Sequence, residues 1–258
     1  MSVAGFTEST VGNVINTLGK NHVIPAVPID PPMLSMTLLP NDSPLKGKEA
    51  DKSSMTQIKE RVMKESQDDV SLKVSNAGKG SDRLVVSGRG DLHLGVLFEK
   101  MRREGYEMAV TPPEVLTKKC EKTGEILEPY EEVEIETDME FMNMILEKMN
   151  GRKGVMMNSK QTKDGRELLI FKVPSRGLLG FRSELLNETR GTALLKSQFS
   201  GYEEFAGEVK KTTKGAIIST AEGKTTAYSL RDVETHGMLF VGPNVQVYPG
   251  MVVGEHVL

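Results

Sequence analysis

Apolar and polar residues alternate with two different periods along the chain, and each period predicts its own kind of element. Residues 34–38 alternate as a half-buried strand does. Four apolar residues further along are spaced i, i+3, i+4 and i+7, namely Leu94, Leu97, Phe98 and Met101. That spacing puts them on one face of a helix. The segment 87–107 around them therefore predicts a strand end, a glycine turn and a helix.

The pattern over residues 30–113 predicts one small α+β unit. Strands are expected at 34–38, 70–74, 83–86 and 106–110. Ser54 and Gln57 have the spacing of a capping box ahead of the first helix. At the second helix, Asp91 is expected to cap the first turn and Gly105 to end it in the left-handed conformation. The order strand, helix, strand, strand, helix, strand is the ferredoxin-like split βαβ pattern.

The same order recurs over residues 114–200. Strands are expected at 115–120, 132–136, 154–158, 168–171 and 192–196. Helices are expected at 138–150 and from Ser175 onward. A repeat of roughly 90 residues exceeds the 20–50-residue periods of solenoid proteins and suits two copies of one α+β unit.

Two flanking regions complete the expected organisation. Residues 1–29 hold short apolar runs between glycines and prolines, and we interpret them as the remnant of a β-barrel second domain. Residues 201–258 are divided by frequent glycines and predict a β-rich C-terminal domain. The chain ends within a predicted core strand, which we interpret as truncation. The expected fold class is α+β, with two ferredoxin-like split-βαβ domains followed by a β-rich domain.

Composition excludes several classes of protein. The single cysteine, Cys120, rules out an internal disulfide and favours a reducing compartment. No apolar run reaches 18 residues and the N-terminus lacks a signal-peptide pattern, so neither a membrane span nor secretion is expected. With no tryptophan and 5% aromatic residues, broad base-stacking platforms are not expected.

Charge is distributed unevenly behind a net value of −3. Residues 121–140 contain nine acidic residues and one basic residue, whereas residues 147–196 contain eleven basic and five acidic residues. A basic region of this kind can meet a polyanion. A solvated surface of mixed charge is the alternative interpretation.

Catalytic and metal-binding motifs are not recognisable. The segment 12–21 has the wrong glycine spacing for a phosphate-binding loop, and 88–95 does not match the dinucleotide GxGxxG pattern. The four histidines and Cys120 show no zinc spacing. Asp91 and His93 stand two apart, so they would not face each other on a helix as an acid–base pair. No catalytic residue, cofactor or metal is therefore expected.

Two arginines occupy the same place in the two units. Arg89 follows a predicted strand and precedes a helix, and Arg176 does the same within Ser175-Arg176-Gly177. Free N–H groups and the dipole at a helix N-terminus favour an anion, and a guanidinium beside them adds a cationic fork. We expect both arginines to face outward toward phosphate groups. The alternative is that they bridge to carboxylates of a neighbouring domain.

Further basic residues extend this expected RNA- and ribosome-binding set. They are Arg102, Arg103, Arg152, Lys153, Arg182, Lys210, Lys211 and Lys214. Cationic groups in a rigid frame are what phosphate contact requires. For Arg102 and Arg103, complementing the dipole at the end of their own helix is an equally open interpretation.

Several stretches carry a resemblance to a known family. Residues 87–94 with 101–107 resemble the third domain of elongation-factor-G-like translational GTPases. Residues 152–154, 173–182 and 189–192 resemble the fifth domain of one branch, the BipA/TypA GTPases. On this resemblance, 30–113 corresponds to the third domain and 114–200 to the fifth.

Residues 239–241 and 247–256 are similar to that branch's own C-terminal domain. The resemblance implies a ribosome-binding protein that acts in translation, ribosome assembly and stress adaptation, with ribosomal RNA and tRNA as partners. It implies a cytoplasmic protein, or alternatively one of a plastid or mitochondrion. GTP and magnesium would belong to the family's GTP-binding domain, which the resemblance does not include. This chain is therefore not expected to hydrolyse GTP. We further expect a monomer without membrane contact.

Two rival interpretations remain open at this point. A scaffold that binds only proteins would associate with its partner without RNA. An enzyme with an unrecognised site would show a deep pocket in which titratable groups converge.

Overall fold

The computed structural model of the chain describes residues 5, 11, 13–19, 22, 24–25, 29–48, 50–78, 82–120, 124–209 and 215–256. The chain divides into two compact units, Met1–Val209 and Lys210–Leu258. The described residues before Met33 form neither helix nor strand, so the proposed barrel remnant stays a prediction.

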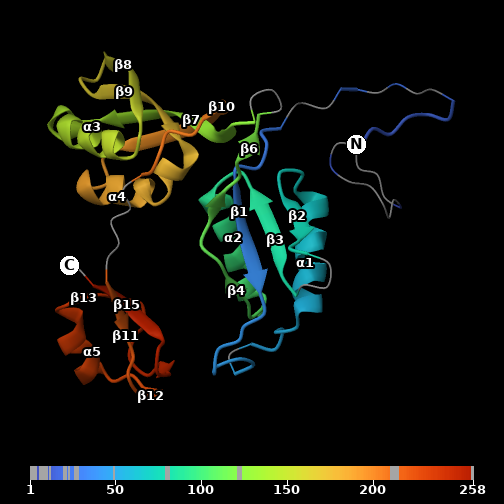
Figure 1. The fold of residues 1–258 in the computed structure, drawn as a ribbon, viewed down its shortest axis with the longest axis vertical. Helices are drawn as coiled ribbons and strands as arrows, with labels where there is room; N and C mark the ends of the chain where they lie inside the picture. The colour runs from blue at the N-terminus through green and yellow to red at the C-terminus, as the bar shows by residue number, and fades with distance from the viewer. Residues whose placement is uncertain are drawn as a thin grey trace. The chain divides into compact units, whose positions relative to one another are not determined.

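The first half of unit 1 is an antiparallel sheet with two helices (Figure 1). Its elements are β1 (Leu34–Leu39), α1 (Met55–Asp68), β2 (Lys73–Asn76), β3 (Leu84–Gly88), α2 (Asp91–Arg103), β4 (Ala109–Val110) and β5 (Glu114–Val115). The strand order is β2-β3-β1-β4, and β5 also pairs with β1. This spatial order confirms the predicted ferredoxin-like split βαβ arrangement.

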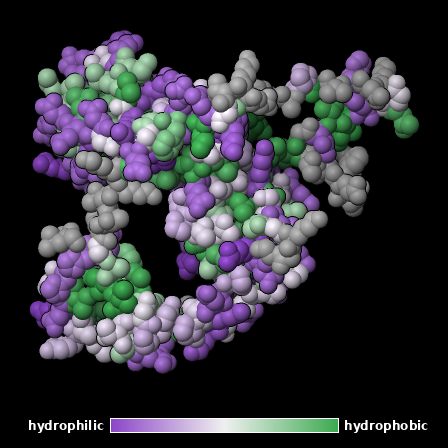
Figure 2. Space-filling view, viewed as in Figure 1, coloured by the Kyte–Doolittle hydropathy of each residue, from purple (hydrophilic) through white to green (hydrophobic). Residues whose placement is uncertain are grey.

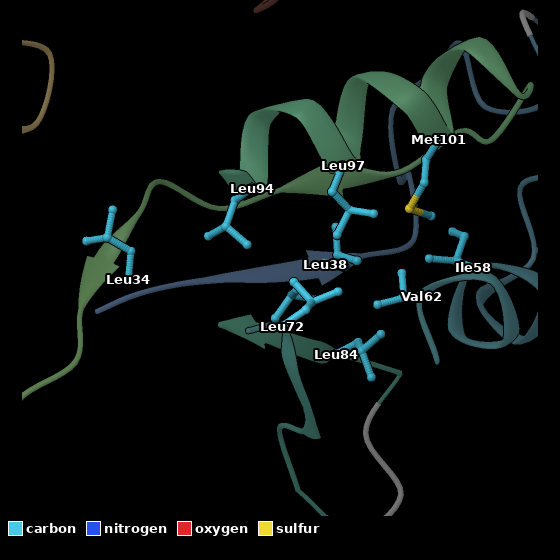
Figure 3. Packing of buried hydrophobic residues seen from close by; sticks show 10 residues of the cluster. Leu34, Leu38, Ile58, Val62, Leu72, Leu84, Leu94, Leu97 and Met101 are labelled. Carbon is cyan, nitrogen blue, oxygen red and sulfur yellow. The ribbon is translucent and has the colours of Figure 1, made fainter. Parts of the chain in front are cut away.

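The core of this half lies between the sheet and the two helices. Figure 3 shows Leu94, Leu97 and Met101 of α2 pointing toward the strands, with two side chains of α1 beside them. Leu94 and Met101 are fully buried, which confirms the face predicted from their spacing. Fully burying a side chain of this kind contributes about 1.5–3 kcal/mol.

Three local predictions in this half were wrong. Val70 and Ser71 are not in a strand, because the backbone turns there, with the Ser71 N–H donating to Asp69 Oδ1 at 2.9 Å. Ser54 is the N-cap of α1, but its side chain accepts no capping hydrogen bond, so the capping box does not form. The N-cap of α2 is Gly90 rather than Asp91. Gly105, by contrast, has the predicted left-handed conformation, with φ +85°.

The second half of unit 1 repeats the plan. Its elements are β6 (Lys118–Lys119), β7 (Ile126–Thr137), the 3₁₀ turn η1 (Met139–Phe141), α3 (Met142–Gly151), β8 (Val155–Gln161), β9 (Glu167–Pro174), the 3₁₀ turn η2 (Ser175–Leu178), α4 (Phe181–Glu188) and β10 (Leu194–Glu204). The strand order β10-β7-β9-β8 is again that of the split βαβ fold. Its core includes the fully buried rings of Phe171 and Phe181.

The helix expected from Ser175 begins six residues later. Residues Ser175–Leu178 form the turn η2, and Gly180 at φ +72° separates this turn from α4. A left-handed residue cannot continue a right-handed helix, so α4 starts at Phe181. Arg176 consequently does not lie at the N-terminus of α4.

Unit 2 is rich in short strands, as predicted, and has one helix within residues 215–256. Its elements are β11 (Ala216–Ile218), β12 (Gly223–Lys224), α5 (Ala227–Glu234), β13 (Gly237–Leu239), β14 (Gln246–Val247) and β15 (Val252–His256). The sheets are β11-β15-β13 and β12-β14. Figure 2 shows apolar residues on the visible surface of this unit, and Ile218, Met238 and Phe240 are exposed. Among the described residues, no helix has the length and apolar character needed to cross a bilayer.

Candidate nucleic-acid interface

The loop between β3 and α2 holds Arg89 in a fixed backbone position. The Arg89 N–H donates to His93 Nδ1 at 3.3 Å. Because Nδ1 accepts this hydrogen bond, the proton of a neutral imidazole is assigned to Nε2, which donates to Asp69 Oδ2 at 2.7 Å. A Cβ on Gly88 would lie 2.8 Å from His93 Nδ1 and 2.9 Å from Leu94 Cδ2, so a larger residue would require one of these side chains to shift.

Asp69 anchors this arrangement as a carboxylate. Burial acts to raise its pKa, but hydrogen bonds from Ser71 and His93 outweigh burial, and the pKa is lowered. The side chain of Arg89 itself is exposed. Within the described ranges no carboxylate pairs with its guanidinium. The first corner therefore presents an outward, unpaired cation, as expected from the sequence.

The second corner has the opposite geometry. The guanidinium of Arg176 donates to both carboxylate oxygens of Glu128 and to the carbonyl oxygen of Gly207. Its side chain is 18% exposed, and that of Glu128 is 1% exposed. The ring of Phe205 lies 4.4 Å from the guanidinium, and the Ala206 N–H also donates to Glu128. The prediction that Arg176 faces outward is wrong, because a carboxylate of its own half neutralises it.

Arg152 is also held inside the second half. It donates to the carbonyl oxygens of Gly177 at 2.6 Å and Leu179 at 3.1 Å, and to Glu184 at 2.6 Å. Its guanidinium lies 5.1 Å from the ring of Phe181. The expectation of an outward phosphate contact is therefore wrong for Arg152, which ties the end of α3 to the start of α4.

Glu184 receives a second cation, Lys148, at 2.5 Å, and Lys148 also pairs with Glu188 at 2.7 Å. Burial acts to raise the pKa of Glu184, but the hydrogen bonds from Lys148 and Arg152 outweigh it and lower the pKa. These pairs fix α3 against α4. Lys153, which follows Arg152, is exposed and has no ion pair within the described part of the chain.

Arg102 and Arg103 share one carboxylate at the end of α2. They pair with Glu99 at 2.7 and 2.8 Å, and their side chains are 71% and 76% exposed. Hydrogen bonds from Arg102 and then Arg103 lower the pKa of Glu99 to about 2. Two cations against one anion leave one excess positive charge, so both interpretations made from the sequence remain compatible with this geometry.

Arg182, the second residue of α4, is exposed and donates to the Leu195 carbonyl oxygen at 3.2 Å. No carboxylate pairs with it among the residues that the structure describes. Lys210, Lys211 and Lys214 lie outside the described residues, and their role stays a prediction.

Sequence reasoning did not include Arg190, which is exposed and lies two residues after the end of α4. The signal that could have found it is a basic residue followed by glycine at a helix end. Lys118 was also left out. Its ammonium group lies 3.9 Å from the ring centroid of Tyr202.

Two further features of the described residues are their possible metal ligands and an open hollow. No group of three or more His, Cys, Asp or Glu side chains there is placed to hold a metal ion. An open hollow of about 560 Å³ borders Tyr130, Glu203 and Phe205. Glu203 is paired with Lys172, and Phe205 lies against the Arg176 guanidinium, so both of these lining groups already have partners within unit 1.

Two protein-family models match this chain and indicate its class of protein. A family model described as the elongation factor G C-terminus matches residues 125–213, which include β7 to β10 of the second split-βαβ half. A second model, the TypA/BipA C-terminal domain, matches residues 214–257. The fold and these matches define an elongation-factor-G-like α+β protein.

Curated relatives then give the branch. The chain is 40% identical to the large ribosomal subunit assembly factor BipA of Bacillus subtilis (strain 168), over 99% of this chain and 42% of the relative. Identity to the proteins of the same name is 34% in Synechocystis and 37% in Salmonella typhimurium, with the same coverage. The chain belongs to the BipA/TypA family and corresponds to its C-terminal part. It spans 42% of the length of these relatives.

Proposed function

We propose that this chain is a ribosome-binding part of a BipA/TypA-type factor and acts in assembly of the large ribosomal subunit. One observation carries the proposal. Arg89 is exposed, lacks an ion pair within the described residues, and is held by the His93–Asp69 hydrogen bond in a relative of proteins named for this role. An exposed cation whose backbone position is held in this way suits a fixed anionic surface.

The contact is made to phosphates of folded ribosomal RNA rather than to bases. Arg89, Lys153 and Arg182 are the cations predicted from the sequence that are exposed without an ion pair among the described residues. Guanidinium and ammonium groups on a rigid frame bind phosphate with geometric specificity. Folded RNA is recognised largely by shape and backbone.

In this proposal the chain binds the ribosome. Hydrolysis of GTP, with magnesium, is the task of the family's GTP-binding domain. Contact with tRNA and a role in stress adaptation are part of the same proposal. Arg152 and Arg176 are withdrawn from the contact set, because Glu184 and Glu128 already neutralise them.

Co-sedimentation with purified Bacillus subtilis large ribosomal subunits tests the proposal. Three phosphate contacts predict a slope of log affinity against log salt of about −2 to −3. Arg89→Ala combined with Arg182→Ala should weaken binding by about tenfold or more and flatten the slope. The matched control removes two exposed cations of α1, Lys59→Ala with Lys64→Ala, and should leave binding nearly unchanged.

A second probe separates RNA contact from a protein-only scaffold. Ribosomal RNA extracted from the same subunits should compete for the chain. Absence of competition, together with a salt-independent affinity, would contradict RNA contact and support the scaffold.

A further inference from the structure

The described residues contain three positive-φ positions that are not glycine. They are Lys153 at φ 64°, Arg190 at φ 53° and Asn244 at φ 67°. Asparagine adopts this conformation comparatively often, whereas lysine and arginine do so rarely. The two cations stand at equivalent places, since each comes two residues after the end of a helix and each precedes a glycine.

Both positions belong to the same helix-ending motif. The Gly154 N–H donates to the Met149 carbonyl oxygen at 2.8 Å, and the Gly191 N–H donates to the Leu186 carbonyl oxygen at 2.7 Å. These 6→1 hydrogen bonds define a Schellman motif, whose left-handed position is usually glycine. A lysine or arginine there carries a backbone conformation that glycine would adopt more easily.

The end of α2 has the same helix-ending motif with glycine at the left-handed position. The Tyr106 N–H donates to the Met101 carbonyl oxygen at 3.1 Å, and the left-handed residue between them is Gly105. The same motif thus holds glycine once and a long cation twice.

The helix dipole alone does not explain the two cations. A positive side chain in the last helical turn interacts with the dipole without adopting positive φ, as Lys148 can in α3. Lys153 and Arg190 are instead exposed, and no carboxylate pairs with either within the described ranges.

Their separation is fixed by the pairing of α3 with α4. Lys148 contacts Glu184 and Glu188, and Arg152 contacts Glu184, so the two helices run antiparallel. Lys153 therefore lies near the start of α4 and Arg190 at its end. The eight residues of α4 span about 12 Å.

We propose that Lys153 and Arg190 are two contacts for RNA backbone phosphates, each placed at a backbone position whose left-handed conformation glycine would adopt more easily. The inference rests on the proposed ribosome binding and deepens it by adding Arg190 and by assigning a role to the left-handed conformation. The left-handed backbone at each site fixes the point from which the side chain leaves the chain.

Replacement by glycine gives a test in which stability and binding move in different directions. For Lys153→Gly and Arg190→Gly, the unfolding temperature should be unchanged or higher by up to about 3 °C. Affinity for purified large ribosomal subunits should fall about three- to tenfold for each, with the salt slope reduced by about one. Lys153→Asn and Arg190→Asn, which keep a side chain suited to positive φ, should lose the same affinity.

Two controls complete the experiment. Gly105→Lys places a cation at the equivalent position of α2 and should lower the unfolding temperature, since it introduces the strain that the other two sites already contain. Lys59→Gln removes one exposed charge elsewhere and should leave affinity within twofold.

The outcomes separate this inference from the proposed function. Unchanged affinity of the glycine variants, with weakened binding of Arg89→Ala, overturns the inference alone. A lowered unfolding temperature with unchanged affinity assigns the two cations to helix capping. Failure of the unaltered chain to bind large subunits overturns both.

Discussion

The corners at Arg89 and Arg176 both place an Arg-Gly pair after a strand, yet their arginines have opposite geometry. Ser87-Gly88-Arg89-Gly90 joins a strand directly to a helix and leaves its arginine exposed. Pro174-Ser175-Arg176-Gly177 joins a strand to a 3₁₀ turn and buries most of its arginine against Glu128. A strand–Arg-Gly–helix pattern therefore does not by itself indicate where the guanidinium points.

The difference follows from where the acids are. At the second corner, β7 supplies the buried carboxylate of Glu128 within reach of Arg176. At the first corner, Asp69 is engaged by His93, and Asp91 accepts the Leu92 N–H at 2.7 Å. Both acids therefore have hydrogen-bond partners other than Arg89, and no carboxylate pairs with the Arg89 guanidinium within the described residues.

Removing each arginine should give the largest contrast. Arg176→Ala leaves Glu128 buried without its cation and should lower the free energy of unfolding by about 3 kcal/mol. Arg89→Ala, at an exposed site, should change it by no more than about 0.5 kcal/mol. Chemical denaturation followed by far-ultraviolet circular dichroism measures both values.

A second substitution distinguishes two causes of the destabilisation, the unpaired buried charge of Glu128 and the packing lost with the arginine side chain. Adding Glu128→Gln to Arg176→Ala removes the unpaired carboxylate and should recover part of the stability. Equal destabilisation by Arg89→Ala and Arg176→Ala would contradict the assignment of the two corners.

The glycines that follow the two arginines, Gly90 and Gly177, should differ in how much stability is lost when each is replaced by alanine. A Cβ on Gly177 would lie 2.5 Å from the Arg152 carbonyl oxygen, whereas a Cβ on Gly90 would meet no atom within 4 Å. Gly177→Ala should therefore destabilise unit 1 by about 2 kcal/mol, and Gly90→Ala should be nearly neutral. Thermal unfolding of the two variants side by side checks this, and a tolerated Gly177→Ala would show that the turn η2 can shift.

Local pattern was sufficient for most elements of the fold, because apolar spacing is a property of neighbouring residues. The face of α2 with Leu94, Leu97 and Met101 and the left-handed Gly105 are examples. The start of α4 was misplaced because Gly180 interrupts a segment whose apolar residues would otherwise suit one helix.

The candidate site was less predictable, since pairing of charges depends on residues distant in sequence. Arg176 and Glu128 are 48 positions apart, and Arg152 and Glu184 are 32 positions apart. The residues adjacent to Arg176 in sequence do not indicate that the carboxylate of Glu128, in β7, will pair with it. The backbone position of Arg89 likewise depends, through His93, on Asp69, which is separated from Arg89 in the chain by β2 and β3.

Affinity for large ribosomal subunits should also distinguish the two arginines, by a smaller effect than the changes in stability. Arg89→Ala should weaken association with large ribosomal subunits about three- to tenfold, since one phosphate contact is lost. Arg176→Lys keeps a cation opposite Glu128 and should leave the affinity unchanged. The measurement is co-sedimentation over a salt series, and weaker binding by Arg176→Lys in a folded variant would return Arg176 to the contact set.

The smallest expected effect concerns Glu131, a buried carboxyl group whose pKa is affected by residues of both corners. Burial raises its pKa, hydrogen bonds from Ser175 and Ser197 oppose this in part, and the negative charge of Asp91 raises it further. The folded protein therefore binds this proton more tightly than the unfolded chain does. The stability contributed by this group is present below its ordinary pKa of 4.5 and is lost as the pH rises through the raised pKa.

Glu131→Gln should accordingly raise the unfolding temperature at pH 7.5 and leave it unchanged at pH 4, because glutamine keeps hydrogen-bonding capacity without the buried charge. Glu132→Gln, on the exposed neighbour of Glu131, is the matched control and should follow the unaltered chain at both pH values. Adding Asp91→Asn to the unaltered chain should reproduce a part of the gain at pH 7.5, since it removes the charge that acts on Glu131 from the first corner. If Asp91→Asn gives no gain at pH 7.5 while Glu131→Gln does, the two corners are electrostatically independent and differ only through their own acids.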